Sequence, residues 1–527
     1  MKHYISTRKI APAITAHEAI IQGLAPDEGL YVPEDFVFLA EESGSFEEGS
    51  LFNLSDLMPL SYTELAEKIL SVFFPDFEKE VLHYCVTNAY AKNFHCEDVV
   101  PVTPMNDGYL MELYHGPTSA FKDIALTLLP HLLTASYAME NRSDTVAILT
   151  ATSGDTGKAA LSGFKDVPHT AITVFYPEDG VSAIQKKQMV SAEGDNVEVI
   201  AVKGNFDDCQ KMVKQAATSP EVKNACKGVT ISSANSINIG RLVPQIVYYF
   251  SSYLKLAKSG KLTLGDEIDF CVPTGNFGDI LAGYLAKKIG LPVRKLICAS
   301  NQNNVLTDFL RTGTYSVKRD FHTTMSPSMD ILVSSNLERL LFFESGNDAA
   351  YVRELMSSLK EKGTYTVQPD MMDNIRAIFA GYYTNEDDCA RTIRSLYDEE
   401  GLLIDPHTAV AVHAMKQYHK EVQTSVPCIV LSTASPYKFC RSVLAALTNN
   451  ASRTGADLCS NSDKHFTSNE ALPQDDFQAM RELHEKTGIP IPSNLADLES
   501  KPVRFTKSID ISSGLQVIAA RMEALSR

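Results

Sequence analysis

One lysine lies in a sequence context that suits covalent chemistry. In the nonapeptide HGPTSAFKD, residues 115–123, a Gly-Pro turn precedes Lys122, and Phe121 and the apolar run 124–126 flank it. An amine at the apolar start of a helix loses contact with water, which lowers its pKa and makes it a nucleophile towards an aldehyde. The other interpretation is a lysine that extends to the surface, and the spacing by itself leaves both open.

Two glycine-containing turns follow apolar segments and precede helix-like ones. The segment TGNFG spans residues 274–278, and TSGDTG spans residues 152–157. Backbone N–H groups at such turns, with the positive end of the following helix, bind phosphate or carboxylate oxygens. The first could equally be an ordinary tight turn, and in the second Ser153 or Asp155 could cap its own helix. Neither segment is a G-x-G-x-x-G or Walker motif.

Two further polar segments lie next to predicted elements. In SANSINIGR, residues 233–241, Arg241 could bind a phosphate with two parallel hydrogen bonds, or it could pair with a carboxylate on a neighbouring helix. In STASP, residues 432–436, hydroxyl groups directly follow an apolar strand. No zinc signature or Ser-His-Asp motif competes with these candidates.

The composition limits the class of protein. The chain has 527 residues, of which 44% are hydrophobic and 21% charged, as in globular proteins. Its 48 Lys and Arg residues against 65 Asp and Glu residues give a formal net charge of −17, which argues against a nucleic-acid or anionic-membrane partner. No apolar run reaches the roughly 18 residues of a membrane span, and no secretory signal opens the chain. We therefore expect a cytoplasmic protein.

The ten cysteines form no pattern that points to chemistry. None belongs to a C-x-x-C pair, so we expect neither a disulfide framework nor a metal site. Cys271, Cys298 and Cys428 lie in or beside apolar runs, which favours small core residues over a catalytic thiol.

The elements that must position these residues alternate between strands and helices. Strand-like runs at 145–150, 171–175, 197–202, 268–272, 294–299 and 428–431, separated by helix-like segments, predict parallel sheets covered on both faces. Residues 301–425 are helix-rich, with helical spacing at 337–343, 352–359, 371–378, 389–396 and 408–418. The first 95 residues predict a small, mostly helical domain in which Ser61 and Glu64 form a capping box. The tail beyond 450 predicts helices near 479–485 and 515–525.

Together these segments resemble the threonine synthases, in the long form found in bacteria and fungi, over most of the chain. HGPTSAFKD, TSGDTG, NSIN-x-x-R and GNFGD carry the resemblance in that order, with YISTR at 4–8 and GLAPDEGLYVP at 23–33. The family has the tryptophan-synthase β-like fold, so the resemblance implies an α/β protein with two open, mostly parallel sheets flanked by helices, and a small N-terminal domain. We expect that domain over 1–95, a catalytic region over 96–450 with a smaller subdomain at about 145–232, and a C-terminal extension over 451–527.

The resemblance also implies roles for individual residues. Lys122 is expected to hold pyridoxal 5'-phosphate covalently and to be catalytic. The cofactor phosphate is expected on Gly275, Asn276, Phe277, Gly278 and Asp279, where Asp279 contributes its N–H or caps the helix, and Thr433 is expected to face the pyridine nitrogen. Thr152, Ser153, Asp155 and Thr156 are expected to bind the carboxylate end of the substrate. The substrate phosphate is expected on Asn235, Ser236 and Arg241, with Lys158 as a further anion contact.

The implied reaction converts O-phospho-L-homoserine and water to L-threonine and phosphate, the last step of threonine biosynthesis, in a monomer or homodimer. Two positions depart from the family pattern: Glu28 replaces the first glycine of P-D-G-G-L-Y, and Ser435 replaces the histidine of T-A-H-P. Two alternatives stay open, a related phospholyase that only eliminates phosphate and a non-catalytic module on the same fold.

Overall fold

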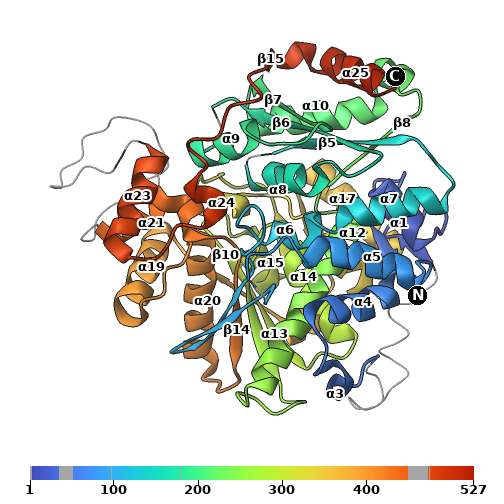
Figure 1. Ribbon diagram of the computed structural model, residues 1–527. Coiled ribbons are helices and arrows are strands. Elements are labelled where there is room, and N and C mark those ends of the chain that lie inside the picture. Colours follow the sequence, from blue (N-terminus) through green and yellow to red (C-terminus); the bar gives the residue numbers. More distant parts are fainter. Residues whose placement is uncertain are drawn as a thin grey trace.

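Two sheets, one above the other in Figure 1, carry the loops that the sequence singles out. The computed structural model describes residues 3–34, 51–96, 98–152, 154–179, 181–448, 473 and 475–526. Ser153, predicted to bind substrate, lies outside the described residues. Both sheets are mostly parallel and flanked by helices, so the predicted fold class is confirmed.

The larger sheet contains the strand ends nearest to Lys122. Its order from edge to edge is β13 (Phe379–Tyr383), β10 (Val293–Ser300), β9 (Ile268–Pro273), β14 (Cys428–Ser432), β4 (Gly108–Glu112) and β3 (Val102–Met105). All neighbours are parallel except the hairpin β3–β4. Strands β9 and β14 are buried along their whole length, as expected for strands covered on both faces. Cys271, Cys298 and Cys428 are buried free thiols here, as predicted.

Helices of the larger sheet begin or end at the candidate loops. Helix α14 (Gly278–Lys288) follows β9 and packs on β10, and α20 (Pro406–Val422) packs on β9, β10 and β14. The remaining elements of this part are α6 (Lys122–Leu126), α7 (Leu129–Met139), α12 (Ile239–Leu242), η1 (Val243–Gln245), α13 (Ile246–Lys258) and α21 (Cys440–Thr448).

The smaller sheet is parallel throughout. Its order is β15 (Ser508–Asp510), β7 (Val197–Lys203), β6 (Thr170–Pro177), β5 (Thr145–Ala151) and β8 (Val229–Ser232). The strand alternation did not predict β15, which comes from the C-terminal tail and adds an edge to β7. Around the sheet lie α8 (Asp155–Phe164), α9 (Ala183–Val190), α10 (Phe206–Thr218), α11 (Pro220–Ala225) and α25 (Gly514–Leu525).

The N-terminal residues form a helical unit with a short antiparallel pair of strands. The strands are β1 (Tyr4–Ser6) and β2 (Tyr31–Pro33), and the helices are α1 (Ala16–Gln22), α3 (Leu54–Leu57), α4 (Tyr62–Phe73) and α5 (Lys79–Tyr90). The predicted capping box of Ser61 and Glu64 is present at the start of α4. Apolar side chains of α4 belong to the same hydrophobic core as the larger sheet.

Residues 301–425 are helical, as predicted, but they also add strands. The helices are α15 (Val305–Thr312), α16 (Leu337–Glu344), α17 (Ala349–Lys362), α18 (Pro369–Ile378), α19 (Glu386–Glu400) and α20, with the short turn η2 (Pro327–Met329). A small hairpin pairs β11 (Thr314–Ser316) with β12 (Thr364–Thr366), and β13 extends the larger sheet.

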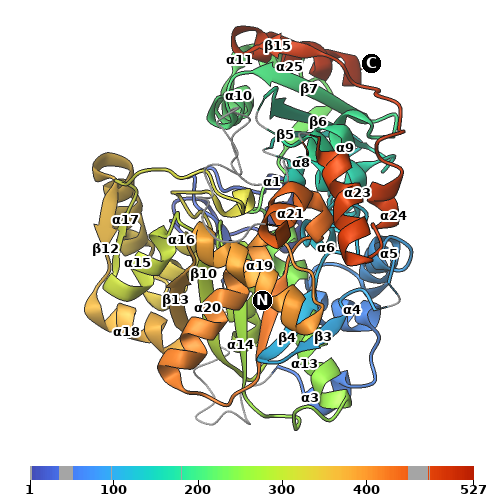
Figure 2. The ribbon, with the colours of Figure 1, turned by 90° about the vertical axis from the view of Figure 1, so that its left-hand side faces the viewer.

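The tail crosses from one sheet to the other (Figure 2). After η3 (Pro436–Phe439) and α21, the described tail contains α23 (Asp476–Thr487), α24 (Ser493–Ala496), β15, η4 (Ile511–Ser513) and α25. Helix α23 packs on α21 and α9, and α25 packs on α10 and α11. None of the helices in the described ranges combines the length and apolar character that crossing a membrane requires.

Candidate active site

The loops predicted to do chemistry lie where strands end and helices begin. Lys122 opens α6, and the loop before it runs along the end of β14. The Phe121 N–H donates to the Thr433 carbonyl oxygen (2.8 Å), and Ala120 forms a β-bridge with Ala434. The structure therefore brings the Lys122 loop directly against the buried Thr433, although the sequence separates them widely.

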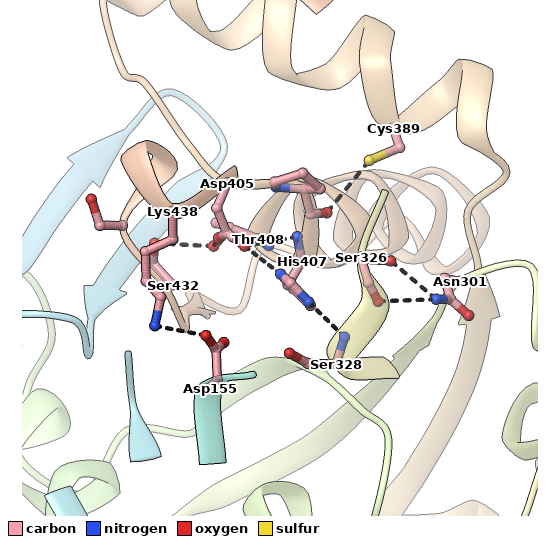
Figure 3. Close-up of polar contacts among 12 residues, drawn as sticks. Asp155, Asn301, Ser326, Ser328, Cys389, Asp405, His407, Thr408, Ser432 and Lys438 are labelled. Carbon is pink, nitrogen blue, oxygen red and sulfur yellow. Dashed lines mark hydrogen bonds and ion pairs between the residues drawn. The ribbon is translucent and has the colours of Figure 1, made fainter. Parts of the chain in front are cut away.

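Lys122, Asp155 and Lys438 form a group that we call the lysine cluster, in which Asp155 and Lys438 are buried and the Lys122 side chain is 12% exposed. Lys438 Nζ lies 2.7 Å from Asp155 Oδ1 (Figure 3), and Lys122 Nζ lies 3.7 Å from Oδ2 of the same carboxylate. Burial lowers the pKa of Lys122, and Asp155 only partly offsets this. Burial acts to raise the pKa of Asp155, but the two ammonium groups hold that pKa below its usual range. The predicted desolvation of Lys122 is confirmed.

Lys438 is the member of this cluster that the sequence did not predict. Its side chain is fully buried, and Nζ also donates to the Thr118 carbonyl oxygen (3.0 Å). Lysines are rarely buried without a partner, so both contacts account for its position. The turn that directs it is capped by Ser435, whose Oγ accepts the Tyr437 N–H (3.4 Å). Ser435, one departure from the family pattern, thus has a structural role as a cap.

The loop 274–278 leads from β9 into α14 and presents unused donors. Phe277 adopts the left-handed conformation (φ 61°), unusual for a non-glycine residue, and is the N-cap of α14. The carbonyl oxygens of Gly275 and Asn276 accept from Ser334 Oγ (2.7 Å) and the Asn336 N–H (3.1 Å). Within the described residues, the N–H groups of 275–278 have no acceptor. A row of free donors at a helix start is suited to an anion.

Asp279 lies in the first turn of α14, but its side chain does not cap the helix. Oδ1 accepts from the hydroxyls of Tyr248 and Tyr249 on α13, at 3.1 Å for Tyr249. Oδ2 is buried and has no partner in the described part of the chain. Burial raises the pKa of Asp279 to about 6, while the two tyrosines and the charge of Lys122 oppose the rise. The expected side-chain cap is therefore wrong.

Arg241 is a buried cation without a counterion. Nη1 donates to the Ala234 carbonyl oxygen (2.8 Å) and Nε has no partner, and no carboxylate among the described residues pairs with the guanidinium. Burial lowers the pKa of Arg241 to about 10, and its charge in turn lowers the pKa of Lys122. The neighbouring Ser236 is half-buried and Asn235 is exposed. Of the two interpretations, the carboxylate pair is wrong for the described chain.

Thr152 closes the turn from β5 into α8. Its Oγ accepts the N–H groups of Gly154 (3.0 Å) and Gly157 (2.9 Å), which leaves the hydroxyl proton free to donate. Asp155 faces the lysines instead, so the alternative in which it caps its own helix is wrong.

Thr156 and Lys158 lie on the same helix, α8, and both are half-buried. Burial, and after it the charge of Lys501 in the tail, lower the pKa of Lys158 to about 8. No side-chain contact of Lys158 within the described ranges fixes it, so the predicted anion contact stays a prediction.

A second buried network, not predicted from the sequence, supports the strand ends (Figure 3). Asp405 caps α20, and its Oδ2 lies 2.6 Å from His407 Nδ1, while His407 Nε2 accepts the Ser328 N–H (3.2 Å). In this arrangement Nε2 is an acceptor and Nδ1 faces the Asp405 carboxylate. The Thr408 hydroxyl donates to Asp405 and lies 3.1 Å from Ser432 Oγ, at the end of β14. Asp-Pro at 405–406 signals a helix start, but not the contact with Ser328.

Asn336 and Arg339 connect the two candidate anion loops. Asn336 Nδ2 donates to a carbonyl oxygen in each loop, at residues 276 (3.0 Å) and 236 (3.3 Å). The fully buried Arg339 donates to Asn336 Oδ1 and to the carbonyl oxygens of Ile237 (2.6 Å) and Tyr31 (3.0 Å). These contacts tie both loops to the N-terminal strand β2, and the sequence did not single out either residue.

Three family models match the chain. A model for pyridoxal-phosphate-dependent enzymes matches residues 105–433. Models for the threonine synthase N terminus and the threonine synthase C-terminal region match residues 3–90 and 408–513. The described part of the chain holds no group of three or more His, Cys, Asp or Glu side chains placed to bind a metal ion.

Named relatives and solved structures agree with these models. Threonine synthase of Pseudomonas aeruginosa is 40% identical over 444 residues, which cover 83% of this chain and 88% of that protein. Threonine synthase-like 1 of Homo sapiens is 38% identical over 465 residues, and the match covers 84% of this chain but only 60% of that longer protein. The structure of pyridoxal-phosphate-bound threonine synthase from Brucella melitensis superimposes over 100% of both chains with a TM-score of 0.83 and 34% identity. The chain therefore belongs to the threonine synthase family of pyridoxal-phosphate-dependent enzymes.

Proposed function

We propose that this protein converts O-phospho-L-homoserine and water to L-threonine and phosphate. One observation carries the proposal: the Lys122 amine, 3.7 Å from the buried Asp155 and with a pKa lowered by burial, is also subject to the positive charge of the buried Arg241, which pairs with no carboxylate among the described residues. An amine nucleophile beside an unoccupied positive charge suits a substrate that is both an amino acid and a phosphate ester.

The residues fit pyridoxal phosphate. Lys122 supplies the desolvated amine that attaches to an aldehyde, and the free N–H groups of 275–278 at the start of α14 suit the cofactor phosphate. We propose that the Asp279 N–H joins them, because its carboxylate is held by the tyrosines of α13. Thr433, at the end of β14, would offer a neutral hydroxyl to the ring nitrogen.

The substrate would bind between the two sheets. We propose that the free hydroxyl proton of Thr152 donates to the substrate carboxylate, together with Ser153 and Thr156 of the same turn. Arg241 Nε, with Asn235 and Ser236, would bind the substrate phosphate, because a buried guanidinium without a counterion is stabilised by an anion.

Asp155 requires a different role from the one that the resemblance implies. A carboxylate that already binds two ammonium groups would repel the carboxylate of the substrate. We propose that Asp155 holds the Nζ of Lys122 whenever that nitrogen carries a proton, and that Lys438 keeps Asp155 ionised and in place.

The mechanism follows from these positions. When bound, the cofactor accepts the electron pair released at the substrate α-carbon. Lys122 Nζ takes the α-proton and then a β-proton, and it returns one proton to the γ-carbon after phosphate has left and one to the α-carbon at the end, because it is desolvated and lies next to the reacting carbons. Arg241 stabilises the negative charge that grows on the phosphate as it leaves the γ-carbon. Water then adds at the β-carbon, and the hydroxyl of threonine results.

The test is a product analysis. Protein loaded with pyridoxal phosphate is incubated with O-phospho-L-homoserine, and threonine, 2-oxobutyrate and phosphate are separated and quantified. We expect threonine and phosphate in equal amounts, and none from the Lys122→Ala variant. Phosphate with 2-oxobutyrate would instead favour the phospholyase, the alternative that the likeness to threonine synthase-like 1 supports. A purified protein that stays colourless with the cofactor would favour the non-catalytic module.

The domain division, the cellular location and the oligomeric state of the protein are also proposals. We propose the division into residues 1–95, 96–450 and 451–527, with the smaller subdomain near 145–232. The family models that match residues 3–90 and 105–433 support the first of these boundaries. We also propose a cytoplasmic monomer or homodimer that binds a small molecule and no nucleic acid, in line with its acidic net charge of −17.

A further inference from the structure

The loop that carries Lys122 is held by residues from the last hundred positions of the chain. The Ser119 carbonyl oxygen accepts the Ser435 N–H (3.1 Å), and the Thr118 carbonyl oxygen accepts from Lys438 Nζ (3.0 Å). Two carbonyl oxygens of the loop, those of residues 116 and 117, are bound from farther along the chain. The residue that binds them is Asn494, in the tail.

Asn494 contacts the loop at three points. Its Nδ2 donates to the carbonyl oxygens of Pro117 (2.9 Å) and Gly116 (3.3 Å), and its amide lies within 3.0 Å of the Ser119 hydroxyl. Ser119 adopts the left-handed conformation (φ 57°), which costs free energy in a residue with a side chain. The amide therefore bonds the strained residue itself and the two residues 116 and 117 before it, three positions upstream of Lys122.

The amide of Asn494 is itself firmly placed. It lies in α24, where the next residue, Leu495, is completely buried, and Leu498 follows in the same apolar cluster. Met480 and Leu483 of α23 belong to this cluster. Because the apolar packing fixes the backbone of α24, the side chain of Asn494 reaches the loop from a rigid support.

We propose that Asn494 is a positioning residue that sets the location of the Lys122 amine by clamping loop 116–119, so that the C-terminal extension completes the active site. Only the turnover readout of this proposal rests on the proposed function. Uptake of pyridoxal phosphate by Lys122 tests it independently.

The experiment compares Asn494→Ala and Asn494→Asp with the wild type and with Asp497→Asn. Asp497 is an exposed residue of the same segment whose side chain does not contact the loop, so its variant is the matched control. Three quantities are measured: the rate at which cofactor-free protein takes up pyridoxal phosphate, followed by absorbance and by borohydride trapping on Lys122; kcat and KM; and the Tm of the cofactor-free protein.

We expect both Asn494 variants to take up the cofactor about tenfold more slowly and to lose about tenfold in kcat with little change in KM, because a misplaced nucleophile affects the chemical step. Asn494→Asp should be at least as impaired as Asn494→Ala, since a carboxylate would face two carbonyl oxygens. The cofactor-free Tm should stay within about 1 °C of the wild type, because one partly buried amide contributes little to global stability.

Uptake and kcat within about twofold of the wild type in both Asn494 variants would overturn the proposal, because no rate would then depend on the clamp. Equal losses in Asp497→Asn, or losses that only accompany a lowered cofactor-free Tm, would overturn it as well. If uptake depends on Asn494 while the wild type forms no threonine, the proposed function fails and the clamp stands.

Discussion

The positive charges of the lysine cluster are paired with a carboxylate, whereas that of Arg241 is paired with none among the described residues. In the lysine cluster, Asp155 lies between two ammonium groups, and Lys438 also donates to a backbone carbonyl oxygen. At Arg241 the guanidinium has one carbonyl partner, and Nε has no partner in the described structure. Both regions are buried, and the charge of one lowers the pKa in the other.

This difference separates structural charge from charge kept for a ligand. Burial of an ion costs free energy unless it is paired, so the paired cluster is stable without a ligand, whereas Arg241 is stabilised only when an anion arrives. The N–H groups of 275–278, which have no acceptor in the described chain, are like Arg241 in being available to an anion. Substitutions in the two regions should therefore differ in what they change.

The largest effect is expected for Lys122→Ala. Without the amine, neither cofactor attachment nor proton transfer has a substitute, so turnover should fall by at least about 10⁴-fold. Borohydride treatment followed by peptide mass analysis should find pyridoxyl-lysine at Lys122 in the wild type and none in the variant. Retained threonine formation would contradict the assignment.

Arg241→Gln should reduce kcat/KM by about 10²- to 10³-fold, because it removes the charge that stabilises the leaving phosphate. In contrast, the Tm of the ligand-free protein should not fall, since an unpaired buried charge is removed with it. Inorganic phosphate should raise the Tm of the wild type but not of the variant. Arg294→Gln is the matched control: Arg294 pairs with the buried Asp269, so its loss should destabilise the fold.

Lys438→Met should destabilise the cofactor-free protein by about 3 kcal/mol near pH 7, because it leaves Asp155 without its nearest cation. The folded-state pKa of Asp155 lies below its unfolded value, so this stabilisation is present above the unfolded pKa and is lost as the pH falls through the folded one. Denaturant unfolding at pH 7 and pH 2.5 should therefore show a smaller difference at pH 2.5. Lys416→Met, which removes a half-exposed pair with Asp107, should cost less than about 1 kcal/mol.

The smallest effect is expected for Asp279→Asn, in the first turn of α14 directly after the loop 275–278. Burial raises the pKa of Asp279 from its ordinary value of 3.8 to about 6, so the folded protein binds more protons than the unfolded chain between these two pH values. The wild type should lose stability relative to the variant as the pH rises through this range. Thermal unfolding at pH 5 and pH 7.5 should show the Tm difference changing by about 1–3 °C in favour of the variant. A pH-independent difference would contradict a raised pKa.

The alternation of strands and helices was predictable because it depends on local periodicity. The strands 145–150 and 268–272 correspond to β5 and β9, and the capping box of Ser61 and Glu64 marks the start of α4. Strands β13 and β15 were not predicted, because each is a short strand at the edge of its sheet, five and three residues long. Pairing with a neighbour, rather than propensity, makes such segments extended.

The residues of the candidate site likewise fall into those with a local sequence signal and those without one. Lys122 and the loop 274–278 stand out because nucleophile, glycine and helix start are adjacent in sequence. Lys438, Asn494 and Asn336 have no local signal, since each acts through a backbone oxygen far away in the chain. Of the two roles expected for Asp279, an N–H donor or a helix cap, the cap is wrong, because the tyrosines that bind its carboxylate lie on another helix, α13.

The sequence by itself determined the alternation of the main strands and helices and the turns between them, because turn geometry and hydrophobic periodicity involve residues within a few positions of each other. The order of its motifs gave the resemblance to the family. Only the tertiary structure decided which buried charges are neutralised and what holds the Lys122 loop. Lys438 and Thr118 are 320 residues apart, and Asn494 and Ser119 are 375 apart, so their pairing exists only once both sheets are packed. A charge is paired or left for a ligand according to its neighbours in space, and one-dimensional spacing does not contain that information.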